Sequence, residues 1–502
     1  MPGLFIQGIS EPAWLRDFSM RRRATFALLC AAAIAVGLAV PSAQASSRQL
    51  TVMQDDDMLL RYDSATRAQA LDEMRELGAD VVKVQVYWNE IAPQGRRKPK
   101  RFDATDPGAY AWDVYDEIVE GVVARGMRPF LSLGNRAPDW ATPKRGRYRG
   151  TYRPSAREFA LFARAAGERY SGSFDGLPRV DLWSIWNEPN LFSWIAPQRA
   201  RNGTPVSPTV YRKLYLAGHS GLRASGHGGD TILLGELMPL GAGSPRKVPP
   251  LEFLREMACL DRGFRPYRGR AARVRDCGGL GRIPTSGLAH HPYTPGGGVH
   301  ASGKRDEAPI GALRDVTRTL DAIARRGRLP RRLPVWITEF GYQTNPPDPF
   351  QFAIRRVPGL MDESEWIAFR NRRVRSYSQY TLRDAALREN AGRFLRYSTF
   401  QMGLRFDDGR KKPGVYDAFP MPAFVRLLGG NRVEVFGGLR AGNGGRARIS
   451  ARVRGGSYRS VGFAPLNPAG YFRRVFKVRR AAEAKYRIDI GGRRRDKSPV
   501  TR

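Results

Sequence analysis

Cysteine is scarce in this chain, and the three cysteines that occur are unevenly placed. Cys30 lies in an apolar run near the N-terminus, whereas Cys259 and Cys277 share one loop-like stretch, "CLDRGFRPYRGRAARVRDC". No zinc-finger spacing is present. Two cysteines in an exported chain usually form a disulfide, so we expect a Cys259–Cys277 bridge, with two unlinked thiols as the alternative.

Acidic residues are few relative to basic ones. The 502 residues include 84 Lys plus Arg against 47 Asp plus Glu, a formal net charge of +37. Such a charge can indicate nucleic-acid binding. The arginines are spread through every segment, however, and neither an RNA-binding aromatic signature nor a P-loop accompanies them. We therefore expect a solvated arginine-rich surface, no nucleic-acid partner and only weak association with anionic cell-wall polymers.

Little of the chain could cross a membrane. Hydrophobic residues make up 42% and charged residues 26%, which is typical of a soluble globular protein. One apolar run, 24–40, follows three arginines and precedes Ala43-Gln44-Ala45, which is the pattern of a signal peptide over 20–45 cleaved after Ala45. The run is short for a spanning helix, although a retained signal anchor is the alternative. We expect a secreted protein without stable membrane insertion after cleavage, and we interpret Met20 as the start.

Short apolar runs recur along the chain and indicate strands. Eight candidates occur, at 50–53, 80–88, 127–134, 180–188, 231–237, 286–293, 334–341 and 395–402. Helical spacing of apolar residues lies between most of them, at 67–78, 109–126, 155–170, 207–224, 249–258, 310–327 and 364–385. Eightfold strand–helix alternation predicts an α/β protein with a closed (β/α)₈ TIM barrel. An open doubly wound sheet is the alternative, but "MQDDDM" after the first strand is not its glycine-rich turn.

The pattern of apolar and polar residues changes near residue 430. Short alternating runs broken by Gly and Asn-Pro predict a small, sandwich-like all-β domain. The expected organisation is an N-terminal extension with signal peptide (1–45), a catalytic barrel (46–428), an all-β domain (429–490) and a basic, disordered tail (491–502).

Polar side chains gather where the predicted strands end. "LWSIWNEPN" at 182–190 runs from buried aromatics into Asn187 and Glu188, and then stops at a proline. Other strand ends carry further polar groups: Asn89, Asn135, Glu236, His290, His291, Tyr293 and Glu339. In a barrel, catalytic groups lie at the carboxyl ends of strands, so we expect these side chains to line one mouth.

Two carboxylates facing each other across that mouth would suit glycosidic-bond cleavage. One must be protonated to donate to the leaving oxygen, and the other ionised to attack the anomeric carbon or to activate a water. The surroundings of the two carboxyl groups must therefore give them different pKa values. Trp183, Trp186 and Trp194 would favour a protonated Glu188, whereas tyrosine and histidine could hydrogen-bond an anionic Glu339.

These motifs carry a family resemblance. "WNEPN" after the fourth strand and "ITEFG" after the seventh resemble the retaining glycoside hydrolases of the (β/α)₈-barrel clan, specifically the cellulase-like (family 5) and β-xylosidase-like (family 39) enzymes. The resemblance covers roughly residues 48–425. It implies that Glu188 is the acid/base, that Glu339 is the nucleophile with Tyr293 hydrogen-bonded to it, and that Asn187 and His291 contact the sugar.

The last strand departs from this resemblance. Many clan members have a tryptophan there as the floor of the sugar site, whereas this chain has "YSTFQMGLRFDDG". We expect Phe400 or Trp88 to supply the floor, and we count Trp88, Asn89 and Asn135 among the substrate-binding candidates.

Two other interpretations remain open at this point. The chain could be a non-catalytic carbohydrate- or cell-wall-binding protein that keeps a barrel, although it retains both glutamates. The acidic run "QDDDM" at 54–58 could indicate a metal site, but three adjacent acids are more often a turn or a helix start. We expect no cofactor and no metal, a carbohydrate substrate and a monomer.

Overall fold

The computed structural model describes residues 49–143, 148–294, 296–300, 303–392, 395–440, 442 and 444–501. The predicted signal peptide, its cleavage site and Cys30 lie outside these residues. Within them, no helix is both long enough and apolar enough to span a membrane.

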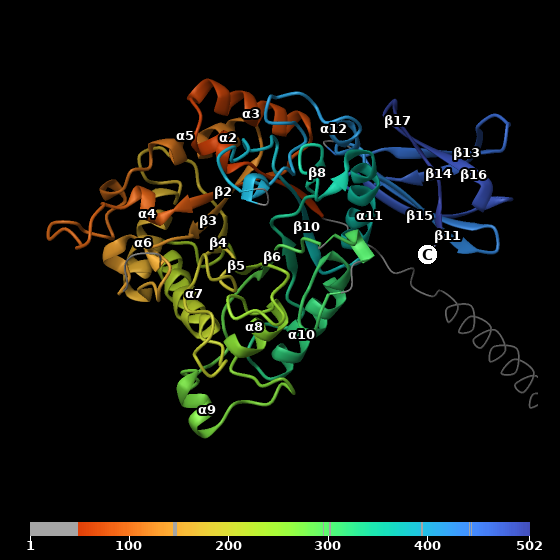
Figure 1. Cartoon of the computed structure of the whole chain (residues 1–502). Helices are drawn as coiled ribbons and strands as arrows, with labels where there is room; N and C mark the ends of the chain where they lie inside the picture. The colour runs from red at the N-terminus through yellow and green to blue at the C-terminus, as the bar shows by residue number, and fades with distance from the viewer. Residues whose placement is uncertain are drawn as a thin grey trace, which may run out of the picture. The chain divides into compact units, whose positions relative to one another are not determined.

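A closed barrel of eight parallel strands forms the first part of the chain (Figure 1), which confirms the predicted fold class. The strands are hydrogen-bonded in the order β1-β10-β7-β6-β5-β4-β3-β2. Their bounds are β1 (Leu50–Gln54), β2 (Val81–Tyr87), β3 (Arg128–Gly134), β4 (Leu182–Ile185), β5 (Thr231–Leu237), β6 (Gly287–His290), β7 (Val335–Ile337) and β10 (Val374–Tyr380). Because every strand runs in the same direction, all eight carboxyl ends meet at one mouth.

Amphipathic helices connect the strands and cover the barrel. The longer ones are α3 (Ser64–Glu76), α5 (Asp113–Ala124), α6 (Ala156–Arg169), α7 (Ser207–Ala224), α8 (Pro250–Met257), α10 (Leu313–Arg325) and α11 (Val357–Arg370). Shorter segments are α2 (Asp56–Leu60), α4 (Trp88–Ile91), α9 (Gly269–Val274), α12 (Val415–Ala418), β8 (Thr344–Asn345) and β9 (Phe352–Ala353). Helix α10 buries Leu313, Val316 and Leu320, one face at helical spacing, against the core.

The eighth barrel strand is not where the sequence analysis placed it. The prediction of a strand at 395–402 was wrong, as was the prediction that one helix spans 364–385. Helix α11 ends at Arg370, and Val374–Tyr380 forms β10, which pairs with β7 and β1 on its two sides. Closing the barrel requires this strand, so pairing on both sides overrides the weak helical pattern of a polar segment.

The C-terminal part folds as two four-stranded sheets, in the orders β15-β12-β11-β18 and β14-β13-β16-β17. They are drawn in blue in Figure 1. The strands are β11 (Ala423–Gly429), β12 (Arg432–Gly438), β13 (Arg446–Val453), β14 (Arg459–Pro465), β15 (Tyr471–Lys477), β16 (Ala484–Ile490), β17 (Arg493–Lys497) and β18 (Val500–Thr501). Buried residues of β11 to β16 form one core cluster. An all-β domain follows the barrel, as predicted.

Two of the predicted boundaries change. The all-β domain begins with β11, a few residues before 429. The expectation of a disordered tail was also wrong, because β17 pairs with β16 and β18 pairs with β11. The charged run does not prevent pairing, because Arg495 turns its guanidinium inward and donates to Asp362 of α11 at 2.9 Å.

Helix α11 packs against the all-β domain. Buried Glu365 accepts hydrogen bonds from Arg440 at 2.6 Å and from Tyr471 at 2.9 Å. The indole of Trp366 donates to Glu434 at 2.7 Å. The same helix therefore contacts both the barrel strand that follows it and the appended domain.

Candidate active site

Glu188 and Glu339 face each other at the carboxyl-terminal mouth of the barrel. Glu188 follows β4, and Glu339 follows β7. One oxygen of each carboxylate and one ring nitrogen of His291 all lie within 4.8 Å of one another. The structure therefore brings together three of the residues that the sequence analysis singled out, from three different strand ends.

The backbone at this mouth is unusually contorted. Four non-glycine residues at the ends of β3, β4 and β5 have left-handed φ values: Asn135 (63°), Trp186 (68°), Glu188 (35°) and Glu236 (56°). Each such residue costs on the order of 1–3 kcal/mol, and such strain concentrates at functional sites. Gly134 adds a close approach, since a Cβ there would meet the Trp186 ring at 2.5 Å. The chain therefore uses strained geometry to aim the side chains of this mouth.

Glu339 is surrounded by hydrogen-bond donors. Its Oε1 lies 3.2 Å from Nζ of Lys83 and accepts from Nε2 of Gln85 at 3.1 Å. Its Oε2 accepts from the hydroxyl of Tyr293 at 3.1 Å and lies 3.4 Å from Nδ1 of His291. The side chain is only 8% exposed. This arrangement orients a carboxylate and replaces the water that it loses on burial.

Glu188 has a sparser environment. Its Oε1 lies 3.0 Å from Nδ1 of His291, and its side chain is 15% exposed. Among the described residues, no other side chain is hydrogen-bonded to this carboxyl group. A carboxyl group with one partner and access to the mouth is better suited to exchanging a proton than the fully coordinated Glu339.

His291 lies between the two glutamates. Burial opposes its positive charge, but Glu339, Glu188 and Glu236 raise the pKa of His291 to about 9. Its neighbour His290 points elsewhere, to the backbone carbonyls of Leu237 and Ala308, and burial lowers its pKa to about 4. The pKa values of the two adjacent histidines therefore shift in opposite directions, and the three carboxylates around His291 favour its imidazolium form.

The three predicted asparagines lie around this mouth. Asn135 and Asn187 are buried, and Asn89 is half-buried. Buried side-chain oxygens of all three have no hydrogen-bond partner among the described residues. Unpaired buried polar atoms are uncommon and call for an explanation, and a polar ligand would supply the missing partners.

Neither Trp88 nor Phe400 forms the aromatic floor that the sequence analysis predicted at the end of the eighth strand. Trp88 lies in α4 and is fully buried, with its ring stacked on Phe162 at 5.4 Å, so its ring offers no open face as a floor for a sugar. Phe400 is 49% exposed and does not end a barrel strand. The residue at the end of the eighth strand is Tyr380, whose ring lies 6.1 Å from that of Phe400.

The sequence analysis missed Lys83 and Gln85 on β2. They alternate with valines in "VVKVQVY", and in a strand alternate residues face the same side. Lys83 is fully buried. Polar residues at every second position of an otherwise apolar strand indicate a polar barrel interior, and this signal could have placed both residues beneath the mouth.

The acidic run 54–58 begins helix α2, as predicted. Asp55 accepts from the backbone N–H groups of Met58, Leu382 and Arg383, which makes it a cap that also joins the last barrel loop. In the part of the chain that the structure describes, the group with metal-ligand geometry is instead Glu188, His291 and Glu339. His291 already pairs with both carboxylates and Lys83 pairs with Glu339, so we assign no metal to them.

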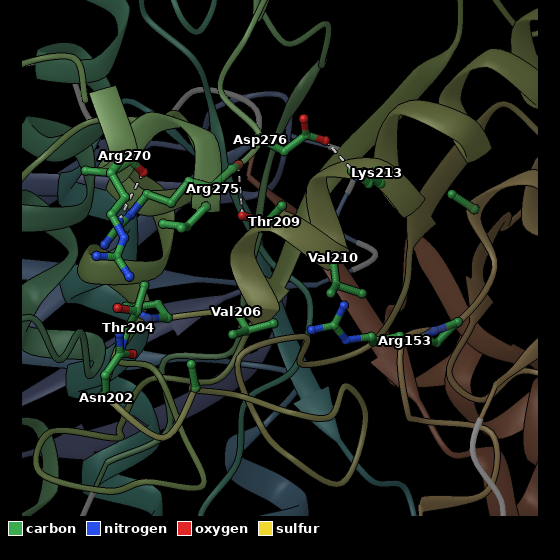
Figure 2. A pocket seen from close by; sticks show the side chains of 16 residues that line it. Arg153, Asn202, Thr204, Val206, Thr209, Val210, Lys213, Arg270, Arg275 and Asp276 are labelled. Atoms are coloured by element: carbon green, nitrogen blue, oxygen red, sulfur yellow. Dashed lines mark hydrogen bonds and ion pairs between the residues drawn. The ribbon is translucent and has the colours of Figure 1, made fainter. Parts of the chain in front are cut away.

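The predicted cysteine pair is joined in the structure. The sulfur atoms of Cys259 and Cys277 lie 2.04 Å apart, with the Cα atoms at 5.8 Å. This link holds the loop that carries α9 beside α7, and between them lies a hollow of about 920 Å³ (Figure 2). Val206, Val210 and Val274 contribute to its wall, and Lys213 pairs with Asp276 at 2.7 Å. Neither Glu188 nor Glu339 lines this hollow, so it is separate from the barrel mouth.

Comparisons with known proteins return distant similarities. No known family profile matches the chain. A curated relative, beta-glucosidase 47 of Arabidopsis thaliana, is 28% identical over 122 residues, which are 24% of this chain. The match spans about a fifth (20%) of that relative's length.

Solved structures are similar at low identity. A glucosidase from Croceicoccus marinus has a TM-score of 0.49 at 9% identity, covering 86% of this chain and 94% of that one. A GH5_18 protein from Streptomyces cattleya, solved in complex with GlcNAc, has a TM-score of 0.47 at 16% identity, covering 74% and 80%. The fold assigned above rests on this chain's own closed strand order.

Proposed function

We propose that this chain is a retaining glycoside hydrolase that cleaves O-glycosidic bonds of a poly- or oligosaccharide by double displacement. The observation that carries the proposal is the approach of Glu188 and Glu339, whose nearest-placed carboxylate oxygens lie within 4.8 Å. Retaining enzymes place their carboxyl groups about 5–5.5 Å apart, and inverting enzymes about 6.5–9.5 Å apart to leave room for water. The short separation favours direct attack on the sugar.

Glu339 is the nucleophile in this proposal. An oxygen of its carboxylate attacks the anomeric carbon while the bond to the leaving oxygen breaks, and a covalent glycosyl-enzyme forms. Lys83, Gln85 and Tyr293 hold the carboxylate in place. Because these donors are already fixed, the reacting oxygen needs little reorganisation before attack.

Glu188 is the acid/base. It gives its proton to the leaving oxygen in the first step and becomes a carboxylate. In the second step it takes a proton from water, the resulting hydroxyl oxygen attacks the anomeric carbon, and Glu339 leaves as a carboxylate. Atoms and charges balance over the cycle, and the sugar keeps its anomeric configuration after two inversions.

The substrate contacts follow from the residues around the mouth. We assign Asn187, Asn89 and Asn135 to hydroxyl groups of the sugar, because their buried oxygens lack partners in the described part of the chain. In this proposal His291 and Tyr293 line the same sugar-binding position at the barrel mouth. Tyr380, at the end of β10, takes the place that we had given to Trp88 or Phe400 as the aromatic platform.

The motif resemblance and the curated relative support this class of reaction. The relative that matches a quarter of the chain is named a beta-glucosidase. Export is a further part of the proposal and rests on residues 20–45 alone. N-terminal sequencing of secreted protein should begin at Ser46, and a membrane-bound form that retains Met20 would contradict it.

A panel of aryl glycosides tests the function. The purified protein should release the aryl group from at least one sugar, and the Glu339→Gln variant should not. A protein that hydrolyses no glycoside but still binds a polysaccharide would instead be a non-catalytic carbohydrate-binding barrel. Retention on DNA that is lost with added salt, without sugar binding, would indicate a nucleic-acid partner.

A further inference from the structure

Glu236 is a charged group that the proposed roles of Glu188 and Glu339 do not use. It lies near the end of β5, and its side chain is fully buried. Four side chains contact its carboxylate: Lys83 (2.8 Å), His291 (2.5 Å), Ser184 (2.5 Å) and Thr338 (2.8 Å). They come from β2, the loop after β6, β4 and the end of β7. A buried polar network whose members are all hydrogen-bonded holds each of them in one arrangement.

Both cations of this cluster also reach the catalytic carboxylates. Lys83 contacts Glu236 and Glu339 with the same ammonium group. His291 contacts Glu236 through Nε2, and it contacts Glu188 and Glu339 through Nδ1. Glu236 is therefore the shared counter-ion of the two cations that touch the reacting groups.

The contact with Glu236 determines which nitrogen of His291 faces the catalytic carboxylates. A carboxylate accepts hydrogen bonds, so Nε2 carries a proton that points to Glu236. Burial opposes ionisation of Glu236, but Lys83 and His291 hold its pKa well below the usual value. The anion therefore persists through the working range of pH, and Nδ1 is left facing Glu188 and Glu339.

We propose that Glu236 is a positioning residue that keeps His291 protonated at Nε2 and charged, so that its Nδ1–H group serves the acid/base Glu188. This inference rests on the proposed function. When Glu188 has given its proton to the leaving oxygen, the new carboxylate accepts a hydrogen bond from Nδ1–H. When Glu188 later takes a proton from water, that hydrogen bond weakens and Nδ1–H turns its donation toward Glu339, which has just left the sugar.

Other groups around His291 limit how far its pKa can change when Glu236 is replaced. Glu188, Glu236 and Glu339 all favour the imidazolium. The Tyr293 ring lies 6.2 Å away, and Lys83 contacts the same two carboxylates as His291, Glu236 and Glu339. Replacing Glu236 by glutamine removes one of three anions, so the pKa of His291 should fall by about one unit, at the lower end of what a neighbouring charge causes.

Nitrogen NMR of the histidine side chains tests this directly. The His291 signals are identified by their loss in a His291→Asn variant. In the wild-type protein, Nε2 should carry a proton throughout pH 5–8, and the imidazolium should persist well above pH 7. In Glu236→Gln the midpoint of the His291 titration should fall by about one unit.

Glu365→Gln is the matched control. Glu365, on α11, is another buried glutamate held by a cation and a hydroxyl, those of Arg440 and Tyr471. Its loss should lower the melting temperature and leave the titration midpoint of His291 unchanged. A His291 midpoint in Glu236→Gln that equals the midpoint in Glu365→Gln would overturn the proposal and leave Glu236 a structural residue.

The wild-type spectrum decides the matter even if Glu236→Gln does not fold. A neutral His291 at pH 7, or one whose Nε2 carries no proton, would contradict the proposal. The NMR measurement needs no turnover. A protein that hydrolyses no glycoside, yet shows the expected His291 titration in both forms, would therefore contradict the proposed function and leave the assignment of the His291 proton intact.

Discussion

The ammonium group of Lys83 lies 3.2 Å from an oxygen of Glu339 inside a barrel where the lysine is fully buried. A buried cation of this kind is tolerated only because carboxylates surround it. Here the carboxylates are the proposed nucleophile and Glu236. The fold of the barrel and the chemistry of its mouth therefore depend on the same charges.

Lys83→Met should destabilise the protein strongly. The change leaves Glu236 and Glu339 without their shared cation, and breaking a buried ion pair from one side costs about 3–5 kcal/mol. Urea unfolding at pH 7 measures the loss. The double variant Lys83→Met/Glu236→Gln should recover part of it, and strictly additive effects would show that the two groups are not coupled.

The two catalytic glutamates should respond differently to deletion. Glu339→Ala removes the nucleophile, so hydrolysis of every substrate should fall by about 10⁴-fold or more. Added azide should fill the space and yield a glycosyl azide of inverted configuration. Rate assays and analysis of the azide product check this, and substantial residual turnover without azide would count against the role of Glu339.

Glu188→Ala should spare activated substrates. Dinitrophenyl glycosides need no proton on the leaving group, so the covalent intermediate should still form and should accumulate, since no base activates water. Azide should then release a product of retained configuration. Mass spectrometry of the intact protein shows whether the glycosyl adduct accumulates. An equal loss of activity on activated and unactivated substrates would argue against the acid/base role of Glu188.

His291 should lose its positive charge above about pH 9. Its pKa is raised to about 9, so the imidazolium is present below that value and is lost as the pH rises through it. Its loss leaves Glu188 and Glu339 with less compensation for their charges. Nitrogen NMR of the His291 side chain measures this, and a titration midpoint near the ordinary histidine value of about 6.5 would contradict it.

Reduction of the Cys259–Cys277 bridge should lower stability without removing activity. The cysteines are 18 residues apart, and closing a loop of about that length contributes roughly 3 kcal/mol by restricting the unfolded chain. Melting of the Cys259→Ser/Cys277→Ser variant tests this against the wild-type protein. Peptide mapping without reductant should find both cysteines in one fragment, and two free thiols would defeat the expectation.

The sequence predicted the parts of the site that a local pattern marks. Glu188 and Glu339 follow apolar strand runs directly, so their place at one barrel mouth followed from the alternation of strands and helices. Lys83 was overlooked although its alternation with valine was visible. Its function depends on Glu236, 153 residues further on, and only the closed barrel brings the two together.

The wrong predictions also have physical causes. Trp88 follows strand β2 directly, but helix α4 begins there and turns the ring into the core against Phe162. The polar segment Val374–Tyr380 became a strand because two neighbours supply its hydrogen bonds. Residues 493–497 resembled a solvated tail, but pairing with β16 and contact with Asp362 order them.

The anomeric configuration of the first-formed product tests the central claim most directly. Proton NMR during the first minutes of hydrolysis, before mutarotation, distinguishes the two anomers of the released sugar. With Glu188 and Glu339 oxygens within 4.8 Å, the account predicts a product with the configuration of the substrate. A first product of inverted configuration from the wild-type protein would contradict the retaining mechanism and the roles of both glutamates.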